Sequence, residues 1–109
     1  MFVVDSKDKP EVESPFPGVA RKNLVWGERM LLTQIIMRAS SVVEEHDHPY
    51  EQMGYCIDGA IELKVGDEKH ICRSGSAWSI PSGARHAAVA LENSVLVEAF
   101  SPPRDDYKD

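Results

Sequence analysis

The chain has 109 residues, a formal net charge of −6 and two cysteines. This length fits one domain whose core is large enough to fold without a disulfide or a structural metal. An acidic balance without any basic run argues against a nucleic-acid partner. No apolar run is long enough to cross a bilayer or to act as a signal peptide. We therefore expect a cytoplasmic protein with no membrane partner, in which Cys56 and Cys72 stay reduced.

Three segments follow from the composition along the chain. Residues 1–18 are polar and carry Pro10, Pro15, Pro17 and Gly18, which is typical of an extended arm. Such an arm lies either along the body or against a second subunit. Residues 19–104 hold the apolar segments and are predicted to form one barrel, and residues 105–109 are an acidic tail.

The first predicted strand covers Ala20–Trp26 and ends at the turn residues Gly27 and Glu28. Residues Met30–Met37 are apolar and partly β-branched, which predicts a strand buried on much of both faces. The leucines and methionines there also fit a helix, but the turn residues on either side are too close together for one. Val42–Glu45 then leads into a strand that carries two histidines.

The rest of the chain repeats a short strand followed by a turn. Asp58 and Gly59 predict a hairpin after Tyr55–Ile57. Apolar and charged residues alternate over Ile61–Val65, which predicts a strand with one wet face. Further short strands are predicted at His70–Cys72, Ala77–Ile80, Arg85–Leu91 and Val95–Phe100. Many short strands with hardly any helical pattern predict an all-β barrel or sandwich. The tryptophans and methionines are expected in its core or along a pocket.

The segment His46-Asp47-His48-Pro49-Tyr50-Glu51-Gln52 predicts a metal site. Histidines two residues apart on a strand point to the same side, and Pro49 should end that strand. Glu51 or Gln52 then returns toward the imidazoles, and His86 is the best candidate for a further ligand. The competing interpretation is a barrel that keeps these residues without binding a metal. His70 lies outside the pattern and is expected at the surface.

Two spaced motifs carry a resemblance to the cupin family. The pattern His46-x-His48-x3-Gln52-x6-Gly59 resembles the first cupin motif, and Gly75-x5-Pro81-x-Gly83-x2-His86 resembles the second. The resemblance implies a double-stranded β-helix, or jelly-roll barrel, with a divalent metal inside one end held by His46, His48, Gln52 and His86. The sequence departs from the family in two places: most cupins have glutamate at position 52, and the asparagine that often follows the second motif is missing.

Gln52 changes the charge of the predicted site. The motif spacing favours Gln52 over Glu51 as the ligand. Three neutral imidazoles and an amide oxygen leave the charge of a divalent ion uncompensated, so the site should attract an anionic ligand and act as a Lewis acid. Zinc, nickel, iron and manganese all accept such ligands, and the sequence does not choose among them.

The histidine segment is similar to the HxHPxEQ form of the KdgF-type cupins of pectin and alginate degradation. The end of the predicted barrel, Glu98-Ala99-Phe100-x3-Arg104, is also like theirs, although that family usually has aspartate where this chain has Glu98. The resemblance implies a homodimeric enzyme that converts unsaturated uronate monosaccharides, an anionic sugar substrate, into linear ketouronates. Glu98 would move protons, Arg104 would pair with the substrate carboxylate and Phe100 would form an apolar wall. Without the resemblance, Glu98 would be a half-exposed strand residue and Arg104 a surface residue beside the acidic tail.

Two other functions remain open from the sequence. The same histidines would serve a cupin dioxygenase, in which the fourth ligand is more often glutamate. A non-catalytic cupin that senses a sugar or a metal would bind its ligand without turnover. Oxygen consumption separates the first alternative from the uronate enzyme, and turnover separates the second.

Overall fold

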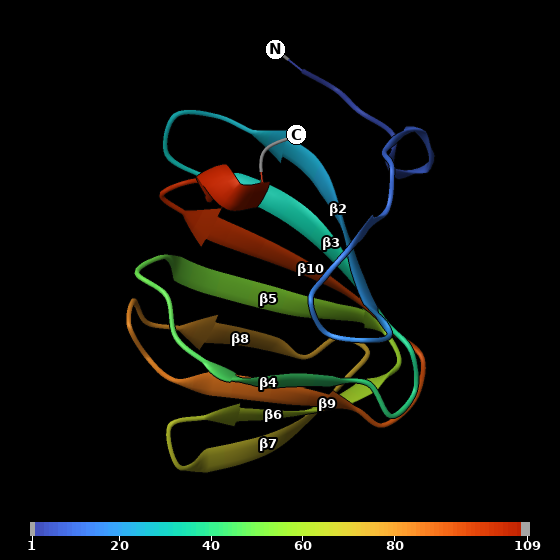
Figure 1. The fold of residues 1–109 in the computed structure, drawn as a ribbon, viewed down its shortest axis with the longest axis vertical. Coiled ribbons are helices and arrows are strands. Elements are labelled where there is room, and N and C mark those ends of the chain that lie inside the picture. Colours follow the sequence, from blue (N-terminus) through green and yellow to red (C-terminus); the bar gives the residue numbers. More distant parts are fainter. Residues whose placement is uncertain (1, 108–109) are drawn as a thin grey trace.

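Ten strands form two antiparallel sheets in the computed structural model, which describes residues 2–107 (Figure 1). The six-stranded sheet has the order β1-β2-β3-β10-β5-β8, and the four-stranded sheet has the order β4-β9-β6-β7. The strands are β1 Val12–Glu13, β2 Val19–Trp26, β3 Leu31–Met37, β4 Val42–His46, β5 Glu51–Asp58, β6 Ala60–Val65, β7 Glu68–Arg73, β8 Ala77–Ile80, β9 His86–Ala90 and β10 Ser94–Ser101. The predicted all-β jelly-roll class is confirmed.

Only two short 3-10 helices accompany the strands within the described residues: η1 Ser6–Asp8 and η2 Asp105–Tyr107. Neither of them is long and apolar enough to span a membrane.

Inward-facing side chains of both sheets make the core. The buried cluster contains Val19, Ile35, Met37, Cys56, Ile61, Leu63, Cys72, Ile80, Ala90 and Leu96. Both cysteines in it are free thiols, as predicted. The alternation along β6 is also confirmed, with Ile61 and Leu63 buried and Glu62 and Lys64 more exposed.

The prediction that Met30–Met37 is buried on much of both faces is wrong. β3 begins at Leu31 and alternates, with Leu31, Thr33, Ile35 and Met37 buried and Leu32 exposed. One face of the strand packs inside the barrel, while the other lies on the outer surface of the six-stranded sheet. The same surface exposes Met53, and Met30 is exposed just before β3, so these two methionines are not in the core. The homodimer expected from the sequence stays a prediction.

The predicted hairpin at Asp58 and Gly59 is also wrong. These residues connect β5 in one sheet to β6 in the other. Gly59 has a φ of +96°, and a Cβ there would lie 2.3 Å from the hydroxyl of Ser94 and 2.4 Å from the carbonyl oxygen of Asn93. A crossing between sheets requires left-handed backbone and close approach just as a tight hairpin does, so the dipeptide alone does not distinguish them.

Segments near both ends of the described residues pack against β2. β1, in the predicted arm, pairs antiparallel with β2 of the same chain, with Val12 opposite Arg21. At the other end, the side-chain amide of Asn23 donates a hydrogen bond to the carbonyl oxygen of Tyr107. Met1 of the predicted arm and residues 108–109 of the predicted tail lie outside the described residues.

Candidate metal centre

The two motifs meet where β4 ends and β9 begins. His46 is the last residue of β4 and lies opposite His86, the first residue of β9. His48 lies beyond the strand, so the prediction of one strand through both histidines is wrong. Pro49 lacks the N–H that would continue the ladder and restricts the residue before it.

The segment after β4 is fixed by the second motif instead. The N–H of Gly83 donates to the carbonyl oxygen of His48 at 2.9 Å, and the hydroxyl of Ser82 donates to the carbonyl oxygen of Pro49 at 2.6 Å. Gly83 has a φ of +79°, a backbone conformation that favours glycine. These bonds carry His48 to the same end of the barrel as His46 and His86.

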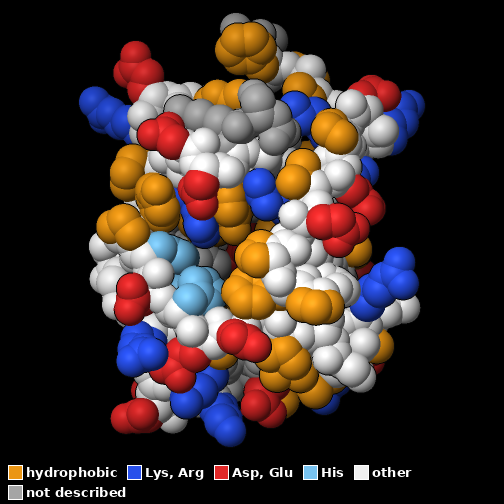
Figure 2. All heavy atoms as spheres, in the orientation of Figure 1, with side chains coloured by type: hydrophobic (Ala, Val, Ile, Leu, Met, Phe, Trp, Pro, Cys, Tyr) orange, Lys and Arg blue, Asp and Glu red, His pale blue; other side chains and the backbone are white. Residues whose placement is uncertain are grey.

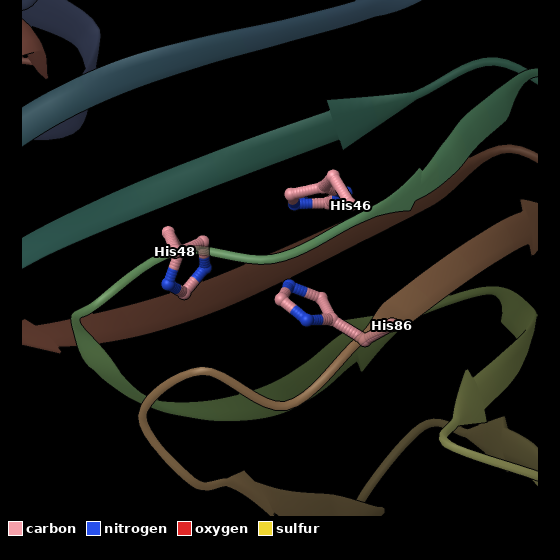
Figure 3. Close-up of side chains that lie close together, drawn as sticks. All are labelled: His46, His48 and His86. Atoms are coloured by element: carbon pink, nitrogen blue, oxygen red, sulfur yellow. The ribbon is translucent and has the colours of Figure 1, made fainter.

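The three imidazoles point toward one another (Figure 3). One ring nitrogen from each of them lies within 4.8 Å of the other two. The ring centroids of His46 and His86 are 4.3 Å apart, and those of His48 and His86 are 4.8 Å apart. This cluster is compatible with one divalent metal ion.

Backbone carbonyls fix the orientation of each ring. Every Nδ1 lies within hydrogen-bond distance of a carbonyl oxygen two residues away: Glu44 for His46 at 2.8 Å, Tyr50 for His48 at 3.1 Å and Ala84 for His86 at 2.8 Å. Because a carbonyl only accepts, each Nδ1 carries the proton, and the lone pair of each Nε2 is left for the site. Metal-binding histidines are typically oriented by such a second contact.

Gln52, rather than Glu51, lies inside the barrel. Gln52 is buried, and its Oε1 is 2.9 Å from Nε2 of His48, whereas Glu51 is exposed on the opposite side of β5. The amide nitrogen of Gln52 donates to Oε2 of Glu98, which turns the amide oxygen toward the histidines.

The residues present fit a cation. Nε2 of His86 is buried and has no hydrogen-bond partner among the described residues. With each Nδ1 protonated, Nε2 of His48 and Oε1 of Gln52 face each other as two acceptors, an arrangement that a cation stabilises. Burial lowers the pKa of His48 and lowers that of His86 to about 4, so both rings are neutral and able to coordinate at neutral pH.

A cavity of about 360 Å³ opens beside the cluster, a size typical of small-ligand sites. In the space-filling view, histidine side chains reach the surface beside a hollow (Figure 2). Glu98 and Phe100 of β10 line this cavity together with His46, Gln52 and His86. The ring of Phe100 is buried with its centroid 5.8 Å from that of His48. Burial raises the pKa of Glu98 to about 7.

Arg104 also lines the cavity, but it has an internal partner. Its Nη2 and Nε lie 3.0 Å and 3.3 Å from the two carboxylate oxygens of Asp106. Its guanidinium carbon lies 3.9 Å from the centroid of the Tyr107 ring. With only 14% of its side chain exposed, Arg104 is not an ordinary surface residue.

Several cavity residues were missed from the sequence, and two of them bear on the charge of the site. Arg21 of β2 and Tyr107 of η2 both line the cavity. The two-residue period of a strand places Arg21 on the same face as the buried Val19 and Asn23, and that signal was available once β2 was predicted. Tyr107 follows the last strand, so no strand periodicity indicated that it would face the cavity. His70 is exposed, 3.4 Å from Glu68 and outside the cluster, in line with its lack of a predicted role.

Comparisons with known proteins bear on the family and the fold. Residues 33–100 match the family described as Cupin domain. The chain is 29% identical over 92 residues to the pectin degradation protein KdgF of Dickeya dadantii (strain 3937), covering 83% of this chain and 84% of that protein. The structure of KdgF from a Halomonas species superposes with a TM-score of 0.89 at 29% identity, covering 95% of this chain and 96% of that one. An RmlC-like cupin from Shewanella frigidimarina NCIMB 400 superposes with a TM-score of 0.90 at 21% identity, covering 96% and 94%, which bears on the fold alone.

Proposed function

This chain belongs to the cupin domain family, and we propose that it is a metal-dependent enzyme that converts 4,5-unsaturated uronate monosaccharides into linear ketouronates. The observation that carries the proposal is one cavity beside which a three-histidine cluster, an acid and an arginine meet. The likeness to KdgF proteins, one of which is described as a pectin degradation protein, supports a substrate of this class.

The placement of three side chains adds support. Glu98, Phe100 and Arg104 were selected by resemblance in sequence, and all three line the cavity beside the histidines. Glu98 and Phe100 reach it because they are two residues apart on β10 and so share its inward face. Arg104 reaches it from the segment that follows the strand.

His46, His48, His86 and Gln52 would hold the divalent ion. When bound, the ion would supply Lewis acidity toward oxygen atoms of the sugar. Its uncompensated charge would favour an anionic sugar over a neutral one.

The remaining residues would bind the sugar and move protons. Arg104 would exchange Asp106 for the sugar carboxylate, since its planar fork matches either carboxylate. Glu98 would deliver a proton to C4 of the enol ether and would take a proton from the water molecule that adds at C5, which restores the acid. The resulting hemiketal would open to the C5 ketone as its hydroxyl proton passes to the ring oxygen. Oε2 of Glu98 accepts from Gln52, which orients the carboxyl group in the cavity. Phe100 would exclude water from one side of the ring.

An ultraviolet assay tests the proposal. Pectin digested with a lyase and an exolyase supplies the unsaturated monosaccharide, and loss of its conjugated alkene absorbance is followed. We expect the protein to accelerate this loss, a chelator or His48→Ala to abolish the acceleration, and removal of oxygen to leave it unchanged. His70→Ala is the matched control, because His70 is exposed and outside the cluster.

Other results would redirect the assignment. Turnover that requires oxygen would favour a cupin dioxygenase, and sugar binding without turnover would favour a sensor. A rate equal to the spontaneous reaction would overturn the proposed activity. Elemental analysis of the purified protein would identify the metal.

A further inference from the structure

A positive charge lies on the inward face of β2. Arg21 faces inward between the buried residues Val19 and Asn23, and it lies opposite the buried Ile35 of β3. Arg21 itself is half-buried, its neighbouring inward positions hold apolar or neutral residues, and withdrawing a charge from water is costly unless it is paired. These neighbours on β2 and β3 supply no counter-charge for Arg21.

The guanidinium of Arg21 is incompletely satisfied. Its Nε is buried and has no hydrogen-bond partner, and within residues 2–107 no carboxylate forms an ion pair with it. A buried donor without an acceptor costs free energy that an incoming acceptor would recover. Arg21 lines the cavity, so such an acceptor can come from a ligand.

Arg21 and Arg104 share one aromatic ring. Their guanidinium carbons lie 4.2 Å and 3.9 Å from the centroid of Tyr107. Stacking on one ring brings both cations to the same side of the cavity, where both line it, although like charges repel. Such a pair is expected where an anion compensates both charges.

Asp106 supplies that anion within the chain. It pairs with Arg104 through both of its oxygens. Although burial alone would raise it, the pKa of Asp106 lies below its ordinary value, because Arg104 donates hydrogen bonds to the carboxylate and the charge of Arg21 adds to the effect. Both arginines therefore act on the same carboxylate.

We propose that Arg21 is a second anion-recognising residue of the cavity, and that Arg21 and Arg104 together bind a carboxylate of the ligand in exchange for Asp106. The inference rests on the proposed function only in one respect: it takes the substrate to carry a carboxylate group. It makes Arg21 a specificity-determining residue, selecting acidic sugars over neutral ones of the same shape.

Binding of an unreactive sugar tests this inference. D-galacturonate carries the carboxylate and lacks the alkene, and D-galactose is its neutral counterpart. Affinities of the metal-loaded protein for both are measured by calorimetry. We expect Arg21→Met to weaken galacturonate binding about 10- to 100-fold, the range for a lost charge-assisted hydrogen bond, and to leave galactose binding unchanged.

Two variants make the measurement specific. Arg73→Met removes the same charge from an exposed position on β7 and should change neither affinity. Arg21→Lys keeps the charge without the planar fork and should recover only part of the lost affinity. Equal galacturonate affinity in the wild type and Arg21→Met, at equal metal content, would overturn the inference.

Asp106→Asn tests the exchange without touching either arginine. Removing the internal carboxylate should tighten galacturonate binding several-fold, because the competing bound state is lost. Weaker or unchanged binding would contradict the proposed exchange.

The inference and the proposed function fail separately. Arg21-dependent galacturonate binding without turnover of unsaturated uronates would remove the activity and leave the inference standing. Turnover of unsaturated uronates together with galacturonate binding that does not depend on Arg21 would support the activity and overturn the inference.

Discussion

The two ends of the barrel differ in chemistry although the same strands build both. One end holds the histidines, an acid and two arginines, and the other is an apolar core whose residues, Val19 and Leu96 among them, extend to the wall of the same cavity. Each of four strands contributes one inward residue to the apolar core and one to the polar end. In that order these are Val19 and Arg21 of β2, Cys56 and Gln52 of β5, Ala90 and His86 of β9, and Leu96 and Glu98 of β10.

This division shows how a small barrel supports a polar site. The apolar end buries enough surface to stabilise each strand, and the polar end then uses inward positions two or four residues away. Polar groups at that end satisfy one another, as Gln52 does with Glu98 and Arg104 with Asp106. The comparison predicts that mutations at one end affect stability and mutations at the other affect metal binding and turnover.

The largest effect is expected from His86→Ala at the polar end. Loss of a buried imidazole from the cluster should remove the metal and lower turnover by about 10³-fold. Losing only a residue that orients a metal ligand typically lowers metal affinity or activity 10- to 100-fold, and loss of the ligand itself should cost more. Elemental analysis and the ultraviolet assay measure both quantities. Full metal content in the variant would show that His86 is not a ligand. His70→Ala, a histidine outside the cluster, should match the wild type.

Leu96→Ala should do the opposite at the apolar end. Leu96 is 3% exposed in the core, and its truncation should lower the free energy of unfolding by about 2–5 kcal/mol. Denaturant titration measures this loss. Leu96 lines the cavity but is not among the residues that would hold the metal, so the metal content of the folded fraction should stay unchanged. A loss of metal with full stability would show that the two ends are not separable.

Glu98→Gln separates proton transfer from positioning. The new amide oxygen can still accept from Gln52, so metal content should be retained. Turnover should fall about 10²-fold, because an amide cannot exchange the proton. Single-turnover kinetics of the metal-loaded variant measure this step. Wild-type turnover would exclude Glu98 as the acid and base.

The smallest effect is expected at Gly54, which lies opposite Trp78. A Cβ at Gly54 would lie 2.1 Å from the Trp78 ring, so Gly54→Ala should cost about 1–3 kcal/mol of stability as the ring shifts. Gly27→Ala is the control, since a Cβ there meets nothing within 4 Å. Equal melting temperatures for the two variants would contradict this packing role.

The sequence predicted the strands and the cluster better than it predicted contacts between strands. Periodicity and turn residues located β2 and β8 within one residue at each end. The alternation of apolar and polar residues and the turn residues on either side mark where a strand begins and ends, and both are local features of the sequence. Motif spacing identified His46, His48, His86 and Gln52 as candidates, and the fold brings them together.

What the sequence missed depends on long-range pairing. The Asp58-Gly59 crossing was taken for a hairpin, because left-handed backbone is required in both cases. The contact of Gly54 with Trp78 and the stacking of Tyr107 on two arginines join residues distant in the sequence. Exposure of Met30 and Met53 depends on which face of the six-stranded sheet is covered, which apolar composition does not specify.

The reactivity of the two buried thiols can report how often the folded barrel opens. Cys56 is 0% exposed and Cys72 is 6% exposed, and burial raises the pKa of both thiols. Alkylating reagents attack the thiolate, so the folded barrel should react slowly and each opening event should expose a reactive sulfur. The alkylation rate then measures the free energy of opening under native conditions. Because both sulfurs lie in the apolar core, the same label would reveal whether metal binding at the far end stabilises the whole barrel.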